Sequence, residues 1–285
     1  MEMEFYRRIV ALVGRLESRR LTRNQVFSDG AIVVTWFWAV IHDRPVSWAC
    51  QKQNWPTHLR RHTRPSSTTM SRRMKSSGVR ALLERIEHHV LRPAGLNLVW
   101  MVDGKPLVIG GCSKDRQAGY GRAAGGKAKG YKLHAIFGPG FRVVSWRIAP
   151  MNVDERVMAR RMLRTVSAQG YVLADSNYDS NRLHEVCDSN GELQLLCPRR
   201  YGAGRGMGHR NQTDGRLRSK DLLEGPSDFG RALLVHRFEI EQRFGHLTNW
   251  GGGLTCLPAW ARTHYRVHRW VQAKLVLTAL KLQCA

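Results

Sequence analysis

The stretch YVLADSNYDS, from Tyr171 to Ser180, decides the fold of this chain. Three apolar or small residues run into Asp175, and turn-forming residues follow at once. A short apolar run bounded by turn signals is typical of a buried strand that ends at the edge of a sheet. An acid at such a place is a cap, a turn residue or part of a functional site.

The charge of the chain indicates a polyanionic partner. The 285 residues include 46 Lys and Arg against 22 Asp and Glu, which gives a formal net charge of +24. Such an excess favours DNA, RNA or an anionic membrane surface as partner. The longest apolar run, Ala31 to Ile41, is too short to span a bilayer, and the N-terminal MEMEFYRRIV lacks the features of a signal peptide. We therefore expect a cytoplasmic, nucleoid-associated protein that binds nucleic acid and no membrane.

Residues 1–95 have the apolar spacing of helices, and Ser28 or Asp29 is placed to cap one of them. Within this region the segment SSTTMSRRMKS predicts a DNA-recognition helix, as in a helix-turn-helix. Its Ser and Thr side chains would bind phosphates, and Arg72, Arg73 and Lys75 would follow them. The alternative is a solvated basic helix that enters no groove.

After a linker at Arg92 to Asn97 the pattern changes, so we expect a second domain over residues 96–285. Short apolar runs alternate with helical segments in the order β-β-β-α-β-α-β, which predicts an α/β fold with a mixed sheet flanked by helices. Residues 199–228 are polar, Gly-rich and basic, and predict a loop or mobile insertion. A long helix over residues 231–250 and a final helix over residues 265–282 follow.

Two of the expected strands end in an acid. WMVDG places Asp103 at the end of the first strand, and VLADS places Asp175 at the end of the fourth. If these strands are neighbours, the two carboxylates stand side by side, and a cation must offset their repulsion. Carboxylate oxygens suit Mg²⁺ or Mn²⁺, and a pair of such ions clamps a phosphodiester for in-line displacement.

The helix over residues 231–250 offers a third acid. Glu239 falls opposite the expected core face, whereas Glu241 falls at its edge, where a ligand should sit. Arg237, four residues before Glu241, could orient it or hold a phosphate. The alternative is an ordinary surface ion pair. The expected core face consists of Leu233, Ile240, Phe244 and Leu247.

The segments VDGKPL, KGYKLHAIF, LADSNYDSNRL and HRFEIEQRFGHL together resemble the catalytic domain of insertion-sequence DDE transposases, over residues 98–280. The resemblance implies a ribonuclease H-like fold in which Asp103, Asp175 and Glu241 bind two Mg²⁺ or Mn²⁺ ions. It also implies that Tyr178 and Arg237 support the site. One large branch of the family has Tyr and Lys where this chain has Leu234 and Thr248.

Other motifs in the sequence are weaker indicators of function. GRAAGGK, Gly121 to Lys127, matches a P-loop up to its Lys, but Ala128 stands where Ser or Thr should hold Mg²⁺. We predict a flexible basic loop here, with Lys127, Lys129 and Lys132 as DNA contacts. His264 and His268 are spaced as on one helix face, for which we expect solvent or DNA. The six cysteines are scattered without a C-x-x-C pair, so we expect reduced packing residues.

The leading hypothesis is a DNA transposase that cleaves transposon ends and joins the freed 3′-OH to target DNA, as a homodimer on DNA. A nuclease or resolvase of the same fold would cut without joining. A repressor or decayed transposase would bind DNA without catalysis.

Overall fold

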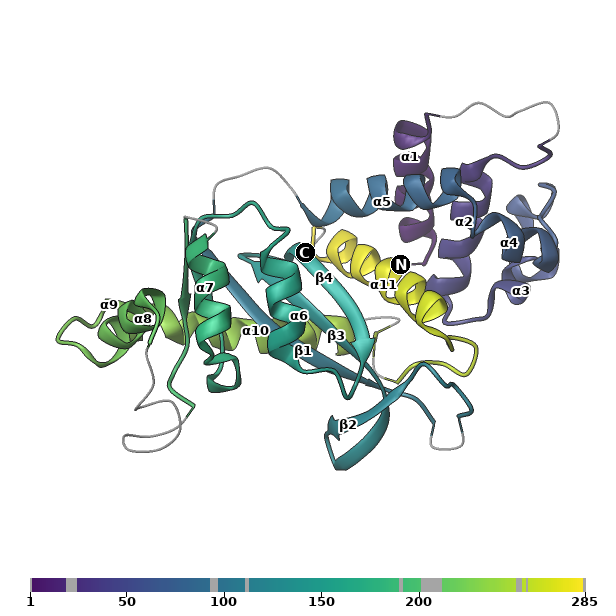
Figure 1. Cartoon of the computed structure of the whole chain (residues 1–285). Coiled ribbons are helices and arrows are strands. Elements are labelled where there is room, and N and C mark those ends of the chain that lie inside the picture. The colour runs from purple at the N-terminus through teal and green to yellow at the C-terminus, as the bar shows by residue number, and fades with distance from the viewer. Residues whose placement is uncertain are drawn as a thin grey trace. The chain divides into compact units, whose positions relative to one another are not determined.

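Two units make up the chain, and their first boundary in the sequence falls after Pro93. The first comprises Met1–Pro93, Trp250–Leu254 and Arg269–Ala285, and the second comprises Ala94–Asn249 and Thr255–His268. The final helix, α11 (His264–Leu282), is therefore divided between them. The computed structural model describes residues 2–18, 25–92, 97–110, 113–189, 192–200, 212–249, 253–254 and 256–283 (Figure 1).

The first unit is helical, which confirms the prediction for this part of the sequence. Ser28 caps α2, where its Oγ accepts a hydrogen bond from the N–H of Ala31 at 3.1 Å. The indole rings of Trp38 and Trp55 stack at 4.7 Å between centroids in its core. Its helices before α11 are α1 (Glu2–Leu16), α2 (Asp29–Ile41), α3 (Val46–Ala49), η1 (Lys52–Asn54), η2 (Thr57–Leu59), α4 (Ser67–Arg73) and α5 (Ser77–Leu91).

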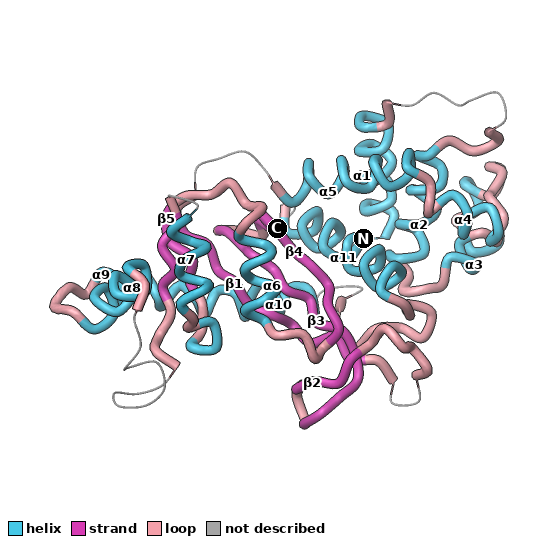
Figure 2. Tube along the Cα trace, viewed as in Figure 1, coloured by secondary structure: helices cyan, strands magenta, loops and turns pink. Residues whose placement is uncertain are grey.

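The second unit is built on one mixed sheet of six strands (Figure 2). The strand order is β2-β3-β1-β5-β6, and β4 also pairs with β3. The pairs among β1 to β4 are antiparallel, whereas β5 runs parallel to both β1 and β6. The strands are β1 (Val99–Val108), β2 (Gly119–Ala123), β3 (Gly126–Gly138), β4 (Arg142–Pro150), β5 (Gly170–Leu173) and β6 (Leu193–Leu196).

Helices cover both faces of this sheet (Figure 1). Trp100, Val102 and Ile136 belong to the core beneath α6 (Glu155–Leu163) and α7 (Asn181–Ser189). Phe137, one residue further along β3, faces the other way and meets Phe244 of α10 (Glu239–Asn249) at 5.4 Å between ring centroids. This alternation follows the two-residue period of a strand. The result is the predicted α/β fold, a mixed sheet between helices.

Three elements differ from the sequence prediction. The expected flexible loop around Gly121 to Lys127 is a β-hairpin, because Gly125 and Gly126 adopt positive φ angles of 87° and 120° in its turn. A helix, α8 (Asp214–Glu224), lies within the segment predicted as a loop. The expected long helix is interrupted: α9 (Phe229–Val235) and α10 are joined by the 3₁₀ turn η5 (His236–Phe238).

Across the described part of the chain, no helix combines the length and apolar character needed to cross a bilayer.

Candidate active site

Asp103 lies on β1, and Asp175 follows the end of its parallel neighbour β5. The register joins Trp100 to Val172 and Met101 to Leu173, and β5 ends there. Each acid comes two residues after the last pair of this β1–β5 ladder. The two carboxyl groups are close enough for the charge of Asp175 to raise the pKa of Asp103.

Asp103 does not end its strand, which corrects the sequence prediction. β1 continues to Val108 because its other edge pairs with β3, where Asp103 is opposite Ala135 and Val108 is opposite Gly130. On one side of β1, Asp103 is thus paired with β3. On the other side, β5 ends before it reaches Asp103. A strand that outruns its neighbour leaves backbone groups without ladder partners.

The carboxyl group of Asp103 accepts a hydrogen bond from one of those backbone groups and is partly desolvated. Its Oδ1 accepts a hydrogen bond from the N–H of Gly104 at 2.7 Å. Burial raises the pKa of Asp103 to about 6, and the negative charges of Asp175 and Glu155 act in the same direction. The N–H of Gly104 and the positive charge of Arg237 oppose this rise in pKa. A carboxyl group that is hard to ionise beside other acids is suited to binding a cation.

Asp175 starts a tight turn that places Tyr178 against the acids. Its carboxylate accepts hydrogen bonds from the backbone N–H of Asn177 at 2.9 Å and from Asn177 Nδ2 at 3.1 Å. Tyr178 closes this turn, η3 (Ser176–Tyr178); its side chain is 1% exposed and its hydroxyl has no hydrogen-bond partner among the described residues. Burial raises the pKa of Tyr178, and the charges of Asp103, Glu155 and Asp175 add to the effect. The unpaired hydroxyl is therefore available to an oxygen atom that enters this site.

Arg237 and Glu241 come from η5 and α10. Arg237 lies within electrostatic range of Asp103 and lowers its pKa. Ile240, Phe244 and Leu247 are buried, as predicted for the core face, and Glu241 is exposed beside them. Among the described residues, Asp103, Asp175 and Glu241 do not form a group whose ligand atoms all lie within 4.8 Å of one another. The role of Glu241 as third ligand stays a prediction.

Glu239, the other acid of this helix, has local partners. It accepts a hydrogen bond from Arg243 Nη2 at 2.7 Å, and its Oε1 lies 2.9 Å from His236 Nδ1. Both interactions remain within one helical stretch, so Glu239 has partners on its own helix, and the alternative of an ion pair between Arg237 and Glu241 stays open.

Glu155, which sequence reasoning did not single out, belongs to the acidic site. It forms an ion pair with Lys132 of β3, and an ideal Cβ on Gly104 would lie 3.3 Å from its Oε1. The signal for Glu155 was its position beside Asp154, the residue that caps α6. Because Lys132 is held by this ion pair, it neutralises an acid of the site rather than standing free for DNA.

Comparison with known proteins identifies the family of this chain. A family model described as "Transposase DDE domain" matches residues 96–272. The chain belongs to the DDE transposase domain family. A cryo-EM structure of the piggyBac transposase synaptic complex with hairpin DNA aligns with 99% of this chain and 74% of that chain, at 8% identity and a TM-score of 0.49. Among curated proteins, no relative matches the sequence.

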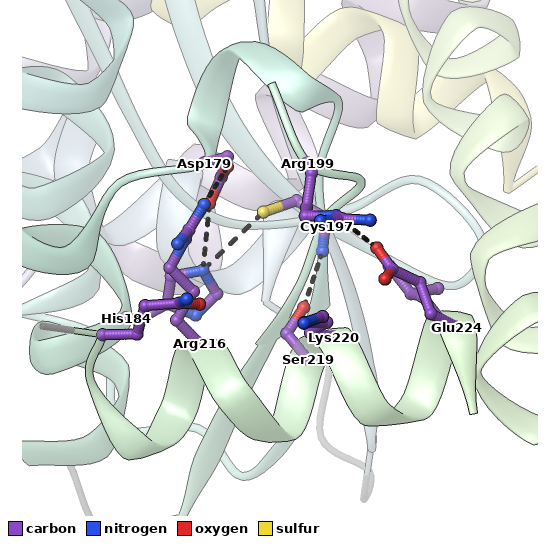
Figure 3. A pocket seen from close by; sticks show the side chains of 10 residues that line it. Asp179, His184, Cys197, Arg199, Arg216, Ser219, Lys220 and Glu224 are labelled. Carbon is purple, nitrogen blue, oxygen red and sulfur yellow. Dashed lines mark hydrogen bonds and ion pairs between the residues drawn. The ribbon is translucent and has the colours of Figure 1, made fainter. Parts of the chain in front are cut away.

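A buried ion pair anchors the segment that follows Asp175 in this DDE domain (Figure 3). Asp179 accepts two hydrogen bonds from Arg216 of α8, at 2.7 and 2.8 Å, and one from the N–H of Arg200 at 3.1 Å. Burial alone would raise the pKa of Asp179, but these donors and His184 hold it well below its usual range. The segment carrying Asp175 and Tyr178 is thereby tied to α8, the helix that the sequence did not predict.

The same place holds a group of metal-ligating residue types. Ligand atoms of Asp179, His184 and Cys197 lie within 4.8 Å of one another, and all three residues are buried. The Asp179 carboxylate is occupied by the guanidinium of Arg216, whose charge repels a cation. Burial also raises the pKa of the Cys197 thiol, so it stays protonated. The group is therefore better suited to stabilising the DDE domain than to holding an ion.

The predicted DNA contacts of the first unit differ in their surroundings. Arg73 donates to Asp29 Oδ1 at 2.7 Å and to the carbonyl of Phe27 at 2.9 Å, and its side chain is 12% exposed. Arg72 and Lys75 are exposed. Arg73 thus supports the fold of this unit, whereas Arg72 and Lys75 remain the candidates for phosphate contacts.

The two histidines of the first turns of α11 contact β4 of the DDE unit, where His264 stays exposed, as predicted, and His268 is half-buried. His264 Nε2 lies 2.9 Å from the carbonyl oxygen of Ile148, and the ring of His268 stacks on Trp146 at 4.5 Å between centroids. Cys187 and Cys197 are buried, in keeping with packing residues, whereas Cys256 is exposed. Cys112 and Cys284 lie outside the described residues.

Proposed function

We propose that this DDE transposase cleaves DNA at transposon ends and joins the freed 3′-OH to target DNA, with divalent metal bound by Asp103, Asp175 and Glu241. The observation that supports it best is that Asp103 and Asp175 each come two residues after the last pair of the parallel β1–β5 ladder and interact electrostatically. Membership of the family supports the DNA substrate, and the net charge of +24 suits a polyanion.

The chemistry of the donors fits Mg²⁺ or Mn²⁺. Asp103 and Asp175 offer carboxylate oxygens, which hard cations prefer. Burial, and then the charges of Asp175 and Glu155, raise the pKa of Asp103, and a cation would offset both effects. Bound metal ions would activate the attacking water or 3′-OH and stabilise the leaving oxygen. Glu241 is proposed as the third ligand because it lies at the edge of the buried face of α10.

The residues around the acids have distinct proposed roles. Arg237, with its positive charge near Asp103, would hold a non-bridging phosphate oxygen. The unpaired Tyr178 hydroxyl would donate a hydrogen bond to an oxygen of the substrate or of a bound water. The Lys132–Glu155 ion pair would keep Glu155 from competing with the substrate phosphate for Arg237.

Cleavage of a labelled transposon end in Mg²⁺ tests the proposal. We expect wild-type protein to nick the end and to form a joined product, and Asp175→Asn to lose both by about a hundredfold or more. Asp228→Asn is the matched control, because Asp228 is an acid of the same unit whose side chain is 91% exposed. Cleavage without a joined product would instead identify a nuclease or resolvase. DNA binding with no cleavage by any variant would identify a non-catalytic protein.

A further inference from the structure

The β2–β3 hairpin has two chemically different faces. Its register places Tyr120 opposite Lys129 and Arg122 opposite Lys127. Because side chains alternate along a strand and directly paired residues share a face, these four side chains lie on one face of the hairpin. The other face is made of small residues, namely Gly119, Gly121, Ala123, Gly126, Ala128 and Gly130.

Near the base of the hairpin, the small-residue face packs against the protein. An ideal Cβ on Gly121 would lie 2.5 Å from the carbonyl oxygen of Met151, and one on Gly119 would lie 2.0 Å from Asn152 Oδ1. The segment that follows β4 therefore excludes side chains at these two positions, whereas an added Cβ at Gly126, near the tip, would have nothing within 4 Å. The face that carries Tyr120 is turned to solvent, where Tyr120 is 57% exposed.

The base of the hairpin is fixed by a buried acid. Asp115 is 9% exposed and accepts hydrogen bonds at 2.8 Å from the Tyr131 hydroxyl and from the N–H of Thr263. Although burial opposes it, these donors lower the pKa of Asp115, so its charge is satisfied internally. No other acid occurs in the sequence between Asp115 and Asp154. Lys129 lies within electrostatic range of Asp115 and donates to the carbonyl oxygen of Ser113 at 3.0 Å. Arg122 and Lys127 are exposed and carry the remaining positive charge of this face.

Tyr120 is surrounded by this charge. The Nζ atoms of Lys127 and Lys129 lie 5.8 and 6.0 Å from the centroid of its ring. Cation–π contacts at this distance on an exposed side chain are weak. Stacking of a nucleic-acid base on an aromatic ring is stronger, and lysines beside the ring would bind the flanking phosphates. Contact with a duplex backbone would use the Tyr120 hydroxyl, whereas stacking on a base uses its ring.

We propose that the β2–β3 hairpin binds unpaired nucleotides of the DNA substrate, with one base stacked on Tyr120 and the flanking phosphates held by Arg122 and Lys127. This inference rests on the proposed function, since it assigns the hairpin to the same DNA. It adds a class of ligand, the single-stranded flank of a DNA end, and a residue that would bind a base rather than phosphate.

The test uses the full-length chain and a DNA end carrying a short single-stranded flank with 2-aminopurine. We expect wild-type binding to quench the 2-aminopurine fluorescence, and Tyr120→Leu to abolish the quenching and weaken binding about tenfold. Tyr120→Phe should keep both, because the ring is retained. Affinity for the fully paired form of the same DNA should change less than twofold in Tyr120→Leu.

Charge variants separate stacking from phosphate binding. Lys127→Gln should lower the salt dependence of binding by about one counterion without removing the quenching. Lys220→Gln, an exposed lysine of α8, is the matched control and should change neither. Unchanged quenching and affinity in Tyr120→Leu, or an equal loss for paired and unpaired DNA, would overturn the inference. Failure of the proposed function is distinguishable, because it would appear as wild-type binding and quenching without Mg²⁺-dependent cleavage.

Discussion

Lys132 and Glu155 form an ion pair across Gly104, the residue that follows Asp103. Gly104 has no side chain, and the space that a side chain would fill holds Lys132, Glu155 and one nitrogen of His134. The strand β3 is thereby linked to the first turn of α6 directly beside the acidic site.

Gly104→Ala should therefore destabilise the protein. The added Cβ would lie 2.9 Å from Lys132 Cδ and 3.3 Å from Glu155 Oε1, so the ion pair must shift. We expect a loss of about 1–3 kcal/mol in the free energy of unfolding, measured by urea titration. Gly245→Ala is the control, because Gly245 lies in α10 with nothing within 4 Å of an added Cβ. It should gain about 0.5–1 kcal/mol, and a loss of similar size in both variants would refute the steric explanation.

The raised pKa of Asp103 predicts a specific dependence of stability on pH. Between about pH 4 and 6 the native state holds a proton on Asp103 that the unfolded chain releases. The free energy of unfolding should therefore fall as the pH rises through this window, by up to about 3 kcal/mol.

Asp103→Asn removes this ionisation while keeping an oxygen for the N–H of Gly104. Without metal, we expect the variant to be about 1–3 kcal/mol more stable than the wild type at pH 7.5 and nearly equal at pH 4. Urea unfolding at both pH values measures the difference. If the free energy of unfolding changes with pH to the same extent in both proteins, the pKa of Asp103 is not raised by folding. Asp228→Asn should follow the wild type, since Asp228 is an exposed acid.

Asp179→Asn tests the anchor between α8 and the segment after Asp175. The substitution leaves Arg216, whose side chain is 8% exposed, without its anionic partner. Loss of one partner of a buried pair costs about 3–5 kcal/mol. Thermal and urea unfolding should show this loss, whereas Asp228→Asn, which breaks the exposed pair with Arg231, should change stability by less than about 1 kcal/mol. If Asp179→Asn also loses less than about 1 kcal/mol, the Asp179–Arg216 pair contributes little to stability.

Arg72, Arg73 and Lys75 should divide into two classes. Arg73→Gln removes the partner of the buried Asp29, so we expect a loss of about 1–3 kcal/mol in stability. Arg72→Gln and Lys75→Gln should leave stability within about 0.5 kcal/mol and reduce the salt dependence of DNA binding by about one counterion each. Urea unfolding and binding titrations at several salt concentrations measure both effects. If both exposed variants keep the salt dependence of the wild type, the segment that carries Arg72 and Lys75 does not contact DNA.

Much of the fold followed from local patterns in the sequence. The alternation in KGYKLHAIFG and FRVVSWRIAP, with Gly140 at a positive φ of 66° between them, predicted the β3–β4 pair. The apolar run before Asp175 predicted β5. These predictions hold because each element depends on its own residues and its immediate turn.

The rest depended on partners far away in the sequence. The strand β1 runs past Asp103 because β3 pairs with it, and no residue near Asp103 carries that information. Helix α8 is mostly polar, and it is fixed by Arg216, which donates to Asp179, and by Ser219, which accepts from the N–H of Cys197. Glu155 joins the acidic site through packing of α6 on the sheet, which helical periodicity alone did not reveal.

The two acids of the site have unequal mechanical support. Asp103 lies within β1, which stays paired with β3 as far as Val108, so pairing with β3 fixes its backbone on one side. Asp175 begins a turn of three residues, whose shape depends on a few local hydrogen bonds. Beyond the turn, the buried Asp179–Arg216 ion pair ties this segment to α8. The position of Asp103 therefore depends on strand pairing, whereas the position of Asp175 depends on this turn and on an ion pair with a helix more than thirty residues later in the sequence.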